Sequence, residues 1–528
     1  MILPIGLNLV TPKYSRIASQ KVGSNHCVNF ASSDTLEIKE NKKTGVYGKA
    51  AVLGLAVVGG CVLALKRKKV KYPADVEYRK SLLREMNLPE NEYKQLRSII
   101  GCEELNAVTK AADKENYLPG IKAYRANKEA FFPERGNVKS GKFLANLHTH
   151  TIYSDGKFTI AELLEQGAKY GDERVAKLGK GNPFYLAITD HDTLEGCKEA
   201  VEIVKNNPEK YKNLRLVLGI ENSAQVDSPD LLKGPVHVHM ITYGINPFDK
   251  ELNNLIQQKI DINKRNIEKV LSVANTEFGS TLDKFGLNYN YQDLVKMVPA
   301  IGCGIKSVGF YHKDYMQFRL IYSAAVEKNK ELSKYLESQN IKMDFTTPID
   351  MIEKNPDYSK GQKYYDYYFK AIKTHIKSQV PESDYKFVDE KLKNIPSEIV
   401  PTLNRLEEKI MQSAPEYKIP ATEYYTFENL VKFYAGKKHG QMGIAHPGVV
   451  FPYANLKDEG STLRFYDELY RDFKAWGGEK AVYAEDNYGV YYKENENLHN
   501  KLEQVSAKYG LQKIGGLDTH IKDIFASK

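Results

Sequence analysis

Short apolar runs that end in polar or histidine-bearing segments recur along the middle and the end of this 528-residue chain. They cover residues 143–145, 184–189, 214–220, 236–243, 441–445, 481–485 and 511–517. Amphipathic, helix-like segments separate most of them. This alternation predicts an α/β fold with a parallel, barrel-like sheet. In such folds, functional groups gather where the strands end.

The helices are predicted from their end signals and their periodicity. Thr159-Ile-Ala-Glu162 is a capping box followed by apolar residues on one face. Further helices are predicted over 251–275, 427–435 and 494–508. Residues 308–419 have an irregular helical period, few strand-like runs and many Lys and Tyr residues, which predicts a helical insertion. We favour a lid over the site, with RNA binding by stacking and phosphate contacts as the alternative.

The N-terminal region has a different character. Residues 1–48 are rich in Ser, Asn, Lys and Thr without a sustained period, which predicts a disordered tail. Residues 50–65 carry no charge and are flanked by lysines. As a helix they would span about 24 Å, less than the ~30 Å of a bilayer core. The basic run that follows favours a membrane anchor with the remaining chain in the cytoplasm, and a buried or amphipathic helix is the alternative.

These patterns divide the chain into six parts. We predict a tail over 1–48, a candidate anchor over 49–66, a basic linker and helical preface over 67–140, a first barrel part over 141–307, the insertion over 308–419 and a second barrel part over 420–528.

Composition narrows the chemistry. The net charge of +9 is concentrated near the N-terminus, so it does not by itself indicate a nucleic-acid partner. The five cysteines are odd in number and contain no Cys-x-x-Cys pair. This indicates a reducing compartment and argues against both a disulfide framework and a thiolate zinc site.

The first chemical signal follows the run at 143–145. His148 and His150 are two residues apart, so on a strand they point to the same side. Asp155 follows after a turn and adds a carboxylate. Two imidazoles and a carboxylate suit zinc, manganese or iron. The pair alone is also compatible with ordinary surface histidines.

Similar residues follow the later strands. With Asp155, the predicted strand ends supply nine nitrogen or oxygen ligands and no sulfur: His148, His150, Asp155, His191, Glu221, His239, His446, Asp518 and His520. One zinc ion needs only about three or four ligands. The set therefore predicts two or three divalent ions sharing a bridging carboxylate, and such clusters hydrolyse phosphate esters.

Six motifs carry a family resemblance. They are HTHTIYSDG, ITDHDT, GIE, VHMITYG, AHPG and LDTH, in this order. The set resembles the polymerase and histidinol phosphatase (PHP) family of metal-dependent phosphoesterases. It is most similar to the bacterial branch of 5′–3′ exoribonucleases and nucleoside 3′,5′-bisphosphate phosphatases. The resemblance covers residues 143–310 and 420–523.

This resemblance implies a distorted (β/α)7 TIM-like barrel with two or three divalent ions (Mn, Fe or Zn). It also implies that the nine residues are metal ligands and that Glu221 is the bridging one. The chain departs from the family pattern at Ile521, where the family has glycine, and at His237, which is not a ligand position. The arginine and histidine that hold the substrate phosphate in the family have no clean match.

Several polar residues leave two interpretations open. Lys306 and His312 are the nearest candidates for substrate contacts, and a solvated helix face explains them equally well. Asp190 and Asp192 are interpreted as orienting His191, with a helix N-cap as the alternative for Asp192. Asp190, His191 and Glu221 are the catalytic candidates. Lys264 and Arg265 are interpreted as a charged helix surface rather than as site residues.

Together these observations predict a phosphoesterase that hydrolyses phosphate esters of nucleotides or RNA ends by attack of a metal-bound hydroxide. The expected partners are a small phosphate ester, a nucleotide or short RNA, and a membrane tether on the cytoplasmic face, with no duplex DNA. A histidinol-phosphatase-like enzyme and a non-catalytic PHP binding module are the alternatives. The sequence does not determine the oligomeric state.

Overall fold

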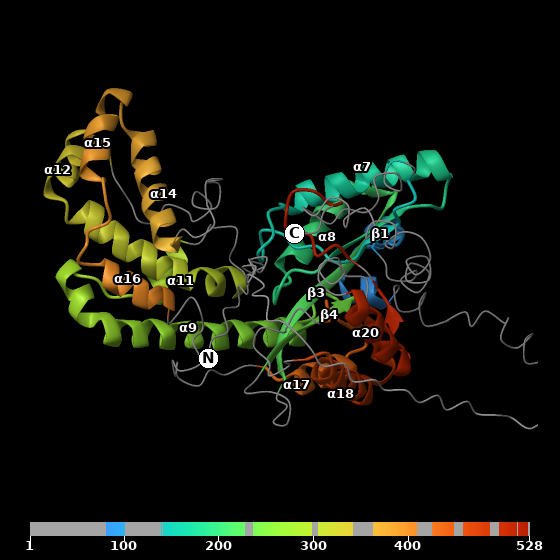
Figure 1. Ribbon diagram of the computed structural model, residues 1–528. Coiled ribbons are helices and arrows are strands. Elements are labelled where there is room, and N and C mark those ends of the chain that lie inside the picture. The colour runs from blue at the N-terminus through green and yellow to red at the C-terminus, as the bar shows by residue number, and fades with distance from the viewer. Residues whose placement is uncertain are drawn as a thin grey trace, which may run out of the picture. The chain divides into compact units, whose positions relative to one another are not determined.

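The computed structural model describes residues 81–100, 139, 141–226, 236–297, 305–341, 363–408, 425–447, 458–485, 496–514 and 516–525 (Figure 1). All of them belong to one compact unit. The predicted tail and the candidate anchor lie outside these ranges. None of the helices in the described ranges is long and apolar enough to cross a membrane. Of the helical preface, α3 (Glu90–Leu96) is described.

A seven-stranded sheet forms the centre of the fold, and each strand neighbours the next one in the sequence. The strands are β1 (Ala145–Asn146), β2 (Phe184–Ile188), β3 (Leu214–Val226), β4 (Val236–Tyr243), β5 (Gln441–Ile444), β6 (Ala481–Ala484) and β7 (Gln512–Lys513). The segments after the first and the last strand also meet, because Thr149 and Thr519 form a parallel bridge. The sheet is therefore curled, with its two edges joined near the predicted ligands.

The strand directions correct one prediction. β4 runs antiparallel to both β3 and β5, whereas the other neighbouring pairs are parallel. Only residues 227–235 separate β3 from β4, and a parallel crossover needs about a dozen residues or more. As a result, β3 extends past Glu221 to Val226, and His239 lies within β4 rather than at its end.

Five amphipathic helices pack against the sheet: α7 (Ile160–Leu178), α8 (Glu195–Asn206), α17 (Phe427–Ala435), α18 (Glu459–Gly477) and α20 (Glu496–Lys508). α7 begins with the predicted capping box: Thr159 accepts from the backbone of Glu162, whose side chain accepts from the backbone of Thr159. The apolar faces of these helices and the outward side chains of the strands share one core. This core fixes the strand ends that carry the predicted ligands.

The long helix α9 (Lys250–Phe285) belongs to two cores (Figure 1). Its first part, including Leu252 and Ile256, joins the sheet core. From Ile267 onward its buried residues join a second, all-helical core. That core also contains α10 (Tyr291–Met297), α11 (Ile305–Tyr322), α12 (Lys330–Ser338), α14 (Tyr364–Gln379), α15 (Tyr385–Lys391) and α16 (Val400–Leu406). The helical part therefore starts inside α9, earlier than residue 308.

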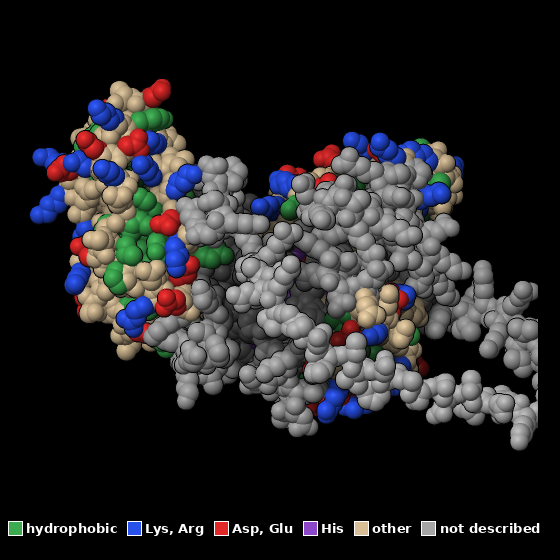
Figure 2. All heavy atoms as spheres, viewed as in Figure 1, with side chains coloured by type: hydrophobic (Ala, Val, Ile, Leu, Met, Phe, Trp, Pro, Cys, Tyr) green, Lys and Arg blue, Asp and Glu red, His purple; other side chains and the backbone are tan. Residues whose placement is uncertain are grey.

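The surface of the helical part mixes both charge signs (Figure 2). Lys373 and Lys377 pair with Asp389, and Lys391 pairs with Glu331. Nucleic-acid binding usually needs a continuous basic stripe. On the face in view, the described side chains mix both signs and show no such stripe, and the lid and RNA-binding interpretations both stay predictions.

Candidate metal centre

The predicted ligands converge at the joined end of the sheet. Eight of the nine fall into three overlapping groups whose ligand atoms lie within 4.8 Å of one another. The first group contains His148, His150, Glu221 and Asp518, the second contains His150, Asp155, His191 and His520, and the third contains His191, Glu221 and His239. The fold therefore brings residues that are far apart in the sequence to one place.

Five ligand-atom distances within the first group are close to the edge length of a coordination tetrahedron. The His148 and His150 Nε2 atoms lie 2.9 Å apart. Each lies 3.2 Å from the Glu221 Oε2 atom, and they lie 3.2 and 3.1 Å from the Asp518 Oδ1 atom. Tetrahedral zinc with ligand bonds of about 2.0–2.1 Å separates neighbouring ligand atoms by roughly 3.3–3.4 Å. The residues present therefore fit a small divalent ion at this point.

The second group is looser and shares residues with its neighbours. The Asp155 Oδ1 atom lies 3.2 Å from His520 Nε2 and 3.7 Å from both His191 Nε2 and His150 Nδ1. His150 and His191 turn their other ring nitrogens toward Glu221. A neutral imidazole has one lone pair, so each of these two histidines can complete only one group at a time. Three groups are therefore not evidence of three ions.

Glu221 lies at the centre of the arrangement. Its Oε2 atom lies near His148, His150 and His191, with the His191 Nδ1 atom at 2.9 Å. Its Oε1 atom lies 2.9 Å from both His239 Nδ1 and His446 Nε2. The two oxygens thus face different sets of imidazoles, as a carboxylate that bridges two ions would.

His446 belongs to none of the three groups, yet it lies beside them. Its Nε2 atom is 3.2 Å from the His239 Nδ1 atom as well as 2.9 Å from Glu221. Its backbone has a φ of +23°, and Asp518 has a φ of +48°. Such left-handed values are uncommon outside glycine. Their occurrence at two predicted ligands is typical of a functional site where the surrounding structure enforces the geometry.

The sequence analysis missed Glu485, the residue after β6. Its two carboxylate oxygens accept from the His148 ring at Nδ1, at 2.9 and 3.0 Å, and its Oε2 atom accepts from the His446 backbone N–H at 2.9 Å. A carboxylate behind a metal-binding histidine fixes the ring and leaves the other nitrogen as the ligand. The available signal was its position at the end of the predicted strand 481–485, because most of the predicted ligands also lie at predicted strand ends.

Two close contacts hold the ends of the curled sheet together. Asn146, which is buried, donates to Thr519 Oγ1 at 2.9 Å and accepts from the Leu517 backbone at 3.0 Å. A Cβ atom at Gly516 would lie 2.2 Å from the Cβ of His148. The glycine is therefore required for the segment with Asp518 to reach the segment with His148.

The two aspartates beside His191 have structural partners. The Asp190 carboxylate accepts from the backbone and hydroxyl of Thr151 at 2.6 and 2.7 Å and from Ser154 Oγ at 2.7 Å. It thereby fixes the loop that follows His150. Asp192 is not the N-cap of α8, because that position is Leu194. The described contacts assign Asp190 to loop support, and its catalytic role stays a prediction.

The buried carboxylates and histidines of the site shift each other's pKa values. Burial alone would raise the pKa of Glu221, but the charges of His191 and His239 hold it well below its ordinary value. Burial alone would lower the pKa of His150, but hydrogen bonds with Asp518 and Glu221 raise it to about 9. Clustered carboxylates need positive charge nearby. Divalent ions supply such charge without protonating the imidazoles.

His312, one of the two predicted substrate contacts, and His237 lie outside the three groups. The Lys306 side chain lies outside the described part of the structure. His312 is buried in α11, a helix that contacts α9, α10, α14 and α16. His237 is half-buried, two residues before His239 on β4. None of these three residues is in the metal-binding groups formed by the described residues.

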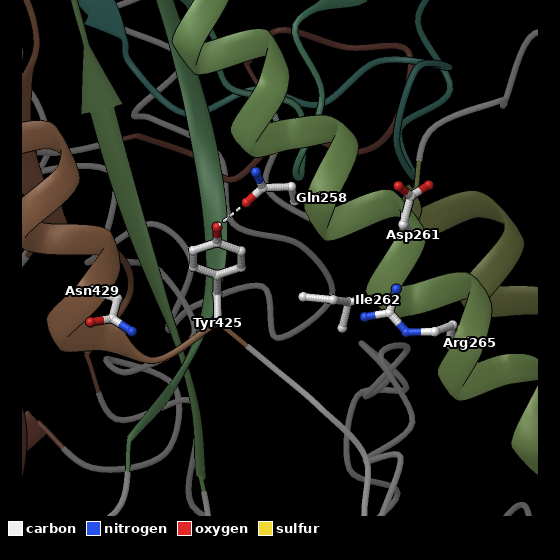
Figure 3. A pocket seen from close by; sticks show the side chains of 6 residues that line it. All are labelled: Gln258, Asp261, Ile262, Arg265, Tyr425 and Asn429. Atoms are coloured by element: carbon white, nitrogen blue, oxygen red, sulfur yellow. Dashed lines mark hydrogen bonds between the residues drawn. The ribbon is translucent and has the colours of Figure 1, made fainter.

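A separate open cleft of about 420 Å³ lies between α9 and the start of α17 (Figure 3). It is lined by Gln258, Asp261, Ile262, Arg265, Tyr425 and Asn429, none of which is a predicted ligand. The Tyr425 hydroxyl donates to the Gln258 side chain at 2.5 Å. Arg265, interpreted above as helix surface, thus lies in the wall of a cleft.

Comparison with known proteins adds little. No protein-family model matches the chain, and no curated protein matches it. One similar solved structure is a protein from Bifidobacterium adolescentis assigned as a metal-dependent phosphoesterase, with 17% identity over 71% of this chain and 87% of that one. Another is an amidohydrolase from Chromobacterium violaceum with bound sulfate and no metal, with 16% identity over 73% and 91%. Both TM-scores are 0.35, which is too low to support any argument.

The central position of Glu221 generates the first prediction. Glu221→Gln keeps the side-chain volume but removes the charge that two ligand sets share. We expect bound metal to fall by about tenfold or more, with the circular dichroism spectrum unchanged. Metal content is measured by mass spectrometry beside Glu428→Gln, a surface change on α17. Full metal content in Glu221→Gln would show that this carboxylate does not bridge ions.

Glu485 generates a second prediction, because it touches ligands without belonging to the metal-binding groups. Glu485→Gln should weaken metal affinity about 10–100-fold, since an amide orients the His148 ring less strongly than a carboxylate. Competition with a metal-sensitive dye would measure the affinity. An unchanged affinity would mean that packing alone orients His148.

Proposed function

We propose that this chain is a metal-dependent phosphoesterase of the PHP type, built on a distorted (β/α)7 barrel. The observation that carries the proposal is the buried Glu221 carboxylate, whose two oxygens face five histidines. The order of the six motifs along the chain supports the same family.

The donor set determines which ions fit. Imidazole and carboxylate groups without sulfur suit manganese, iron and zinc, and two or three such ions match the number of ligands. Bound there, they would make water a nucleophile at neutral pH and neutralise the charge of a phosphate ester. The chain's own groups hold the ions, orient them and exclude bulk water.

Exposure indicates where a substrate reaches the ions. The His239 side chain is 21% exposed, whereas His148, His150 and Glu221 are fully buried. Asp155 is 10% exposed. A phosphate ester would therefore approach from the side of His239, and the fully buried residues would hold the ions from behind.

The cleft beside α9 is suited to the rest of the substrate. β3 leads from Glu221 to Gln225, about 13 Å at ~3.3 Å per residue. The Gln225 backbone donates to the Tyr425 carbonyl at 2.9 Å, beside the cleft. Tyr425 offers a ring for stacking, Gln258 and Asn429 offer amides, and Arg265 offers a guanidinium for a phosphate. We therefore favour a nucleotide or an RNA end as substrate.

Asp261 in the same cleft favours a second candidate. A carboxylate there would attract a cationic amino alcohol and repel an additional phosphate. This supports a small-molecule phosphatase with a substrate such as histidinol phosphate. The two candidate functions differ in the charge of the substrate group that the cleft must bind: negative for a nucleotide with a second phosphate, positive for an amino-alcohol phosphate.

A substrate comparison distinguishes them. We expect kcat/KM in manganese to be higher for adenosine 3′,5′-bisphosphate or a 5′-phosphorylated RNA dinucleotide than for histidinol phosphate. The reason is the second anionic group, which Arg265 can contact. A tenfold preference for histidinol phosphate, about 1.4 kcal/mol in transition-state binding, would replace the nucleotide assignment. No hydrolysis of any phosphate ester by the metal-loaded protein would contradict the phosphoesterase itself.

The role of the cleft is tested by removing its cation. Arg265→Ala should lower kcat/KM for adenosine 3′,5′-bisphosphate about tenfold, because one exposed charge-assisted contact is lost. Hydrolysis of p-nitrophenyl phosphate should not change, since this ester is too short to reach the cleft. Lys264→Ala is the matched control, because Lys264 is the adjacent cation and does not line the cleft. If kcat/KM fell equally in the two variants, the cause would be non-specific electrostatic attraction and not a contact in the cleft.

A further inference from the structure

A buried lysine contacts the loop that carries His191. Lys259 lies on α9 and is 7% exposed. Its ammonium group pairs with the Asp192 Oδ1 atom and donates to the Ser223 carbonyl at 2.8 Å. A buried ammonium group is costly unless both charge and hydrogen bonds are satisfied. Asp192 directly follows His191, and Ser223 lies two residues after Glu221.

Asp192 transmits this contact to the ligands on either side. Its carboxylate also accepts from the Ser223 backbone at 3.1 Å, and its own backbone donates to the Glu221 carbonyl at 2.9 Å. Its φ is +51°, a left-handed conformation that must be held by its surroundings. The preceding residue, His191, forms a parallel bridge with Glu221. Lys259, Asp192 and Ser223 thus form a connected set of hydrogen bonds beside the backbone of His191 and Glu221.

His191 is held from both sides, but by different parts of the fold. On one side, Asp190 is fixed by Thr151 and Ser154, which belong to the same ligand-bearing loop as His150. On the other side, Asp192 is fixed by Lys259 from α9. The same helix continues into the second core. His191 itself is shared by two of the three metal-binding groups.

We propose that Lys259 is a positioning residue that connects α9 to the metal centre through Asp192 and so sets the orientation of His191. Metal binding by the two groups that contain His191 then depends on the helix that carries the second core. The proposal rests on the proposed function in that the ions are those of the same centre. It does not depend on which phosphate ester is the substrate.

A plain structural role makes a different prediction. If Lys259 only balances the charge of Asp192, removing both charges together should restore whatever the single change loses. If Lys259 positions His191, removing both charges should restore stability but not metal affinity, because the bonds to the loop are still missing. The double variant therefore separates the two roles.

The experiment compares Lys259→Met, Asp192→Asn and the double variant. Each protein is titrated with Co²⁺, and binding is monitored by calorimetry and by visible absorption. Thermal unfolding of the metal-free proteins is measured alongside. Lys264→Met on the same helix is the control, because Lys264 is half-buried and lies 3.9 Å from Glu268 and 5.4 Å from the centre of the Tyr291 ring, and neither contact is with a predicted metal ligand. We expect the Co²⁺ affinity of the weakest binding site to be about 10–100-fold lower in Lys259→Met than in the unaltered protein. We also expect Lys259→Met to have a lower Tm. The double variant should regain the Tm but not the affinity.

Two results would overturn the inference while leaving the proposed function intact. One is a Lys259→Met protein that binds Co²⁺ as the unaltered protein does. The other is a double variant that regains affinity together with Tm. An unaltered protein that binds no Co²⁺, Mn²⁺, Fe²⁺ or Zn²⁺ would instead overturn the proposed function, and this inference with it.

Discussion

The candidate site depends on one buried carboxylate. Glu221 is fully buried, and an ionised carboxylate without partners would be strongly unfavourable there. Its partners are five imidazoles from four separate segments, three around one oxygen and two around the other. The fold therefore has to bring those segments together to within hydrogen-bonding distance of a single side chain. That requirement explains why the segments after β1, β2 and β5 meet the antiparallel strand β4 at this point.

The antiparallel direction of β4, which its short connection to β3 imposes, also brings His239 to Glu221. β3 pairs with β2 as far as Leu218 and with β4 from Gly219, so Glu221 lies just after the strand changes partners. Because β4 runs in the opposite direction, its N-terminal half lies at the end of the sheet where the parallel strands finish. His239 reaches Glu221 from within this strand. A parallel β4 would have placed His239 away from the ligand-bearing end.

Local patterns predicted the strands, several helices and the convergence of the predicted ligands, because each of these features depends on residues that are close together in the sequence. The capping box at Thr159 and the helix at Phe427–Ala435 are examples. Partners joined by long-range packing were not predictable in this way. Glu485 lies 337 residues from His148, and Lys259 lies 67 residues from Asp192. Nothing in the residues around either one indicates its partner, and the direction of β4 depended on loop length rather than on periodicity.

The junction of the two cores explains how a large helical insertion is compatible with this site. The chain enters the insertion along α9 and re-enters the sheet core at Tyr425, whose carbonyl accepts from Gln225 on β3. The Tyr425 hydroxyl donates to Gln258 on α9, so the two ends of the insertion are bonded to each other. An insertion whose ends are close together costs the surrounding fold little entropy. The same two ends build the cleft, and Lys259, one residue after Gln258, contacts the His191 loop. Substrate contacts and metal geometry would therefore depend on the same short stretch of α9, residues 258–265, which is about two helical turns.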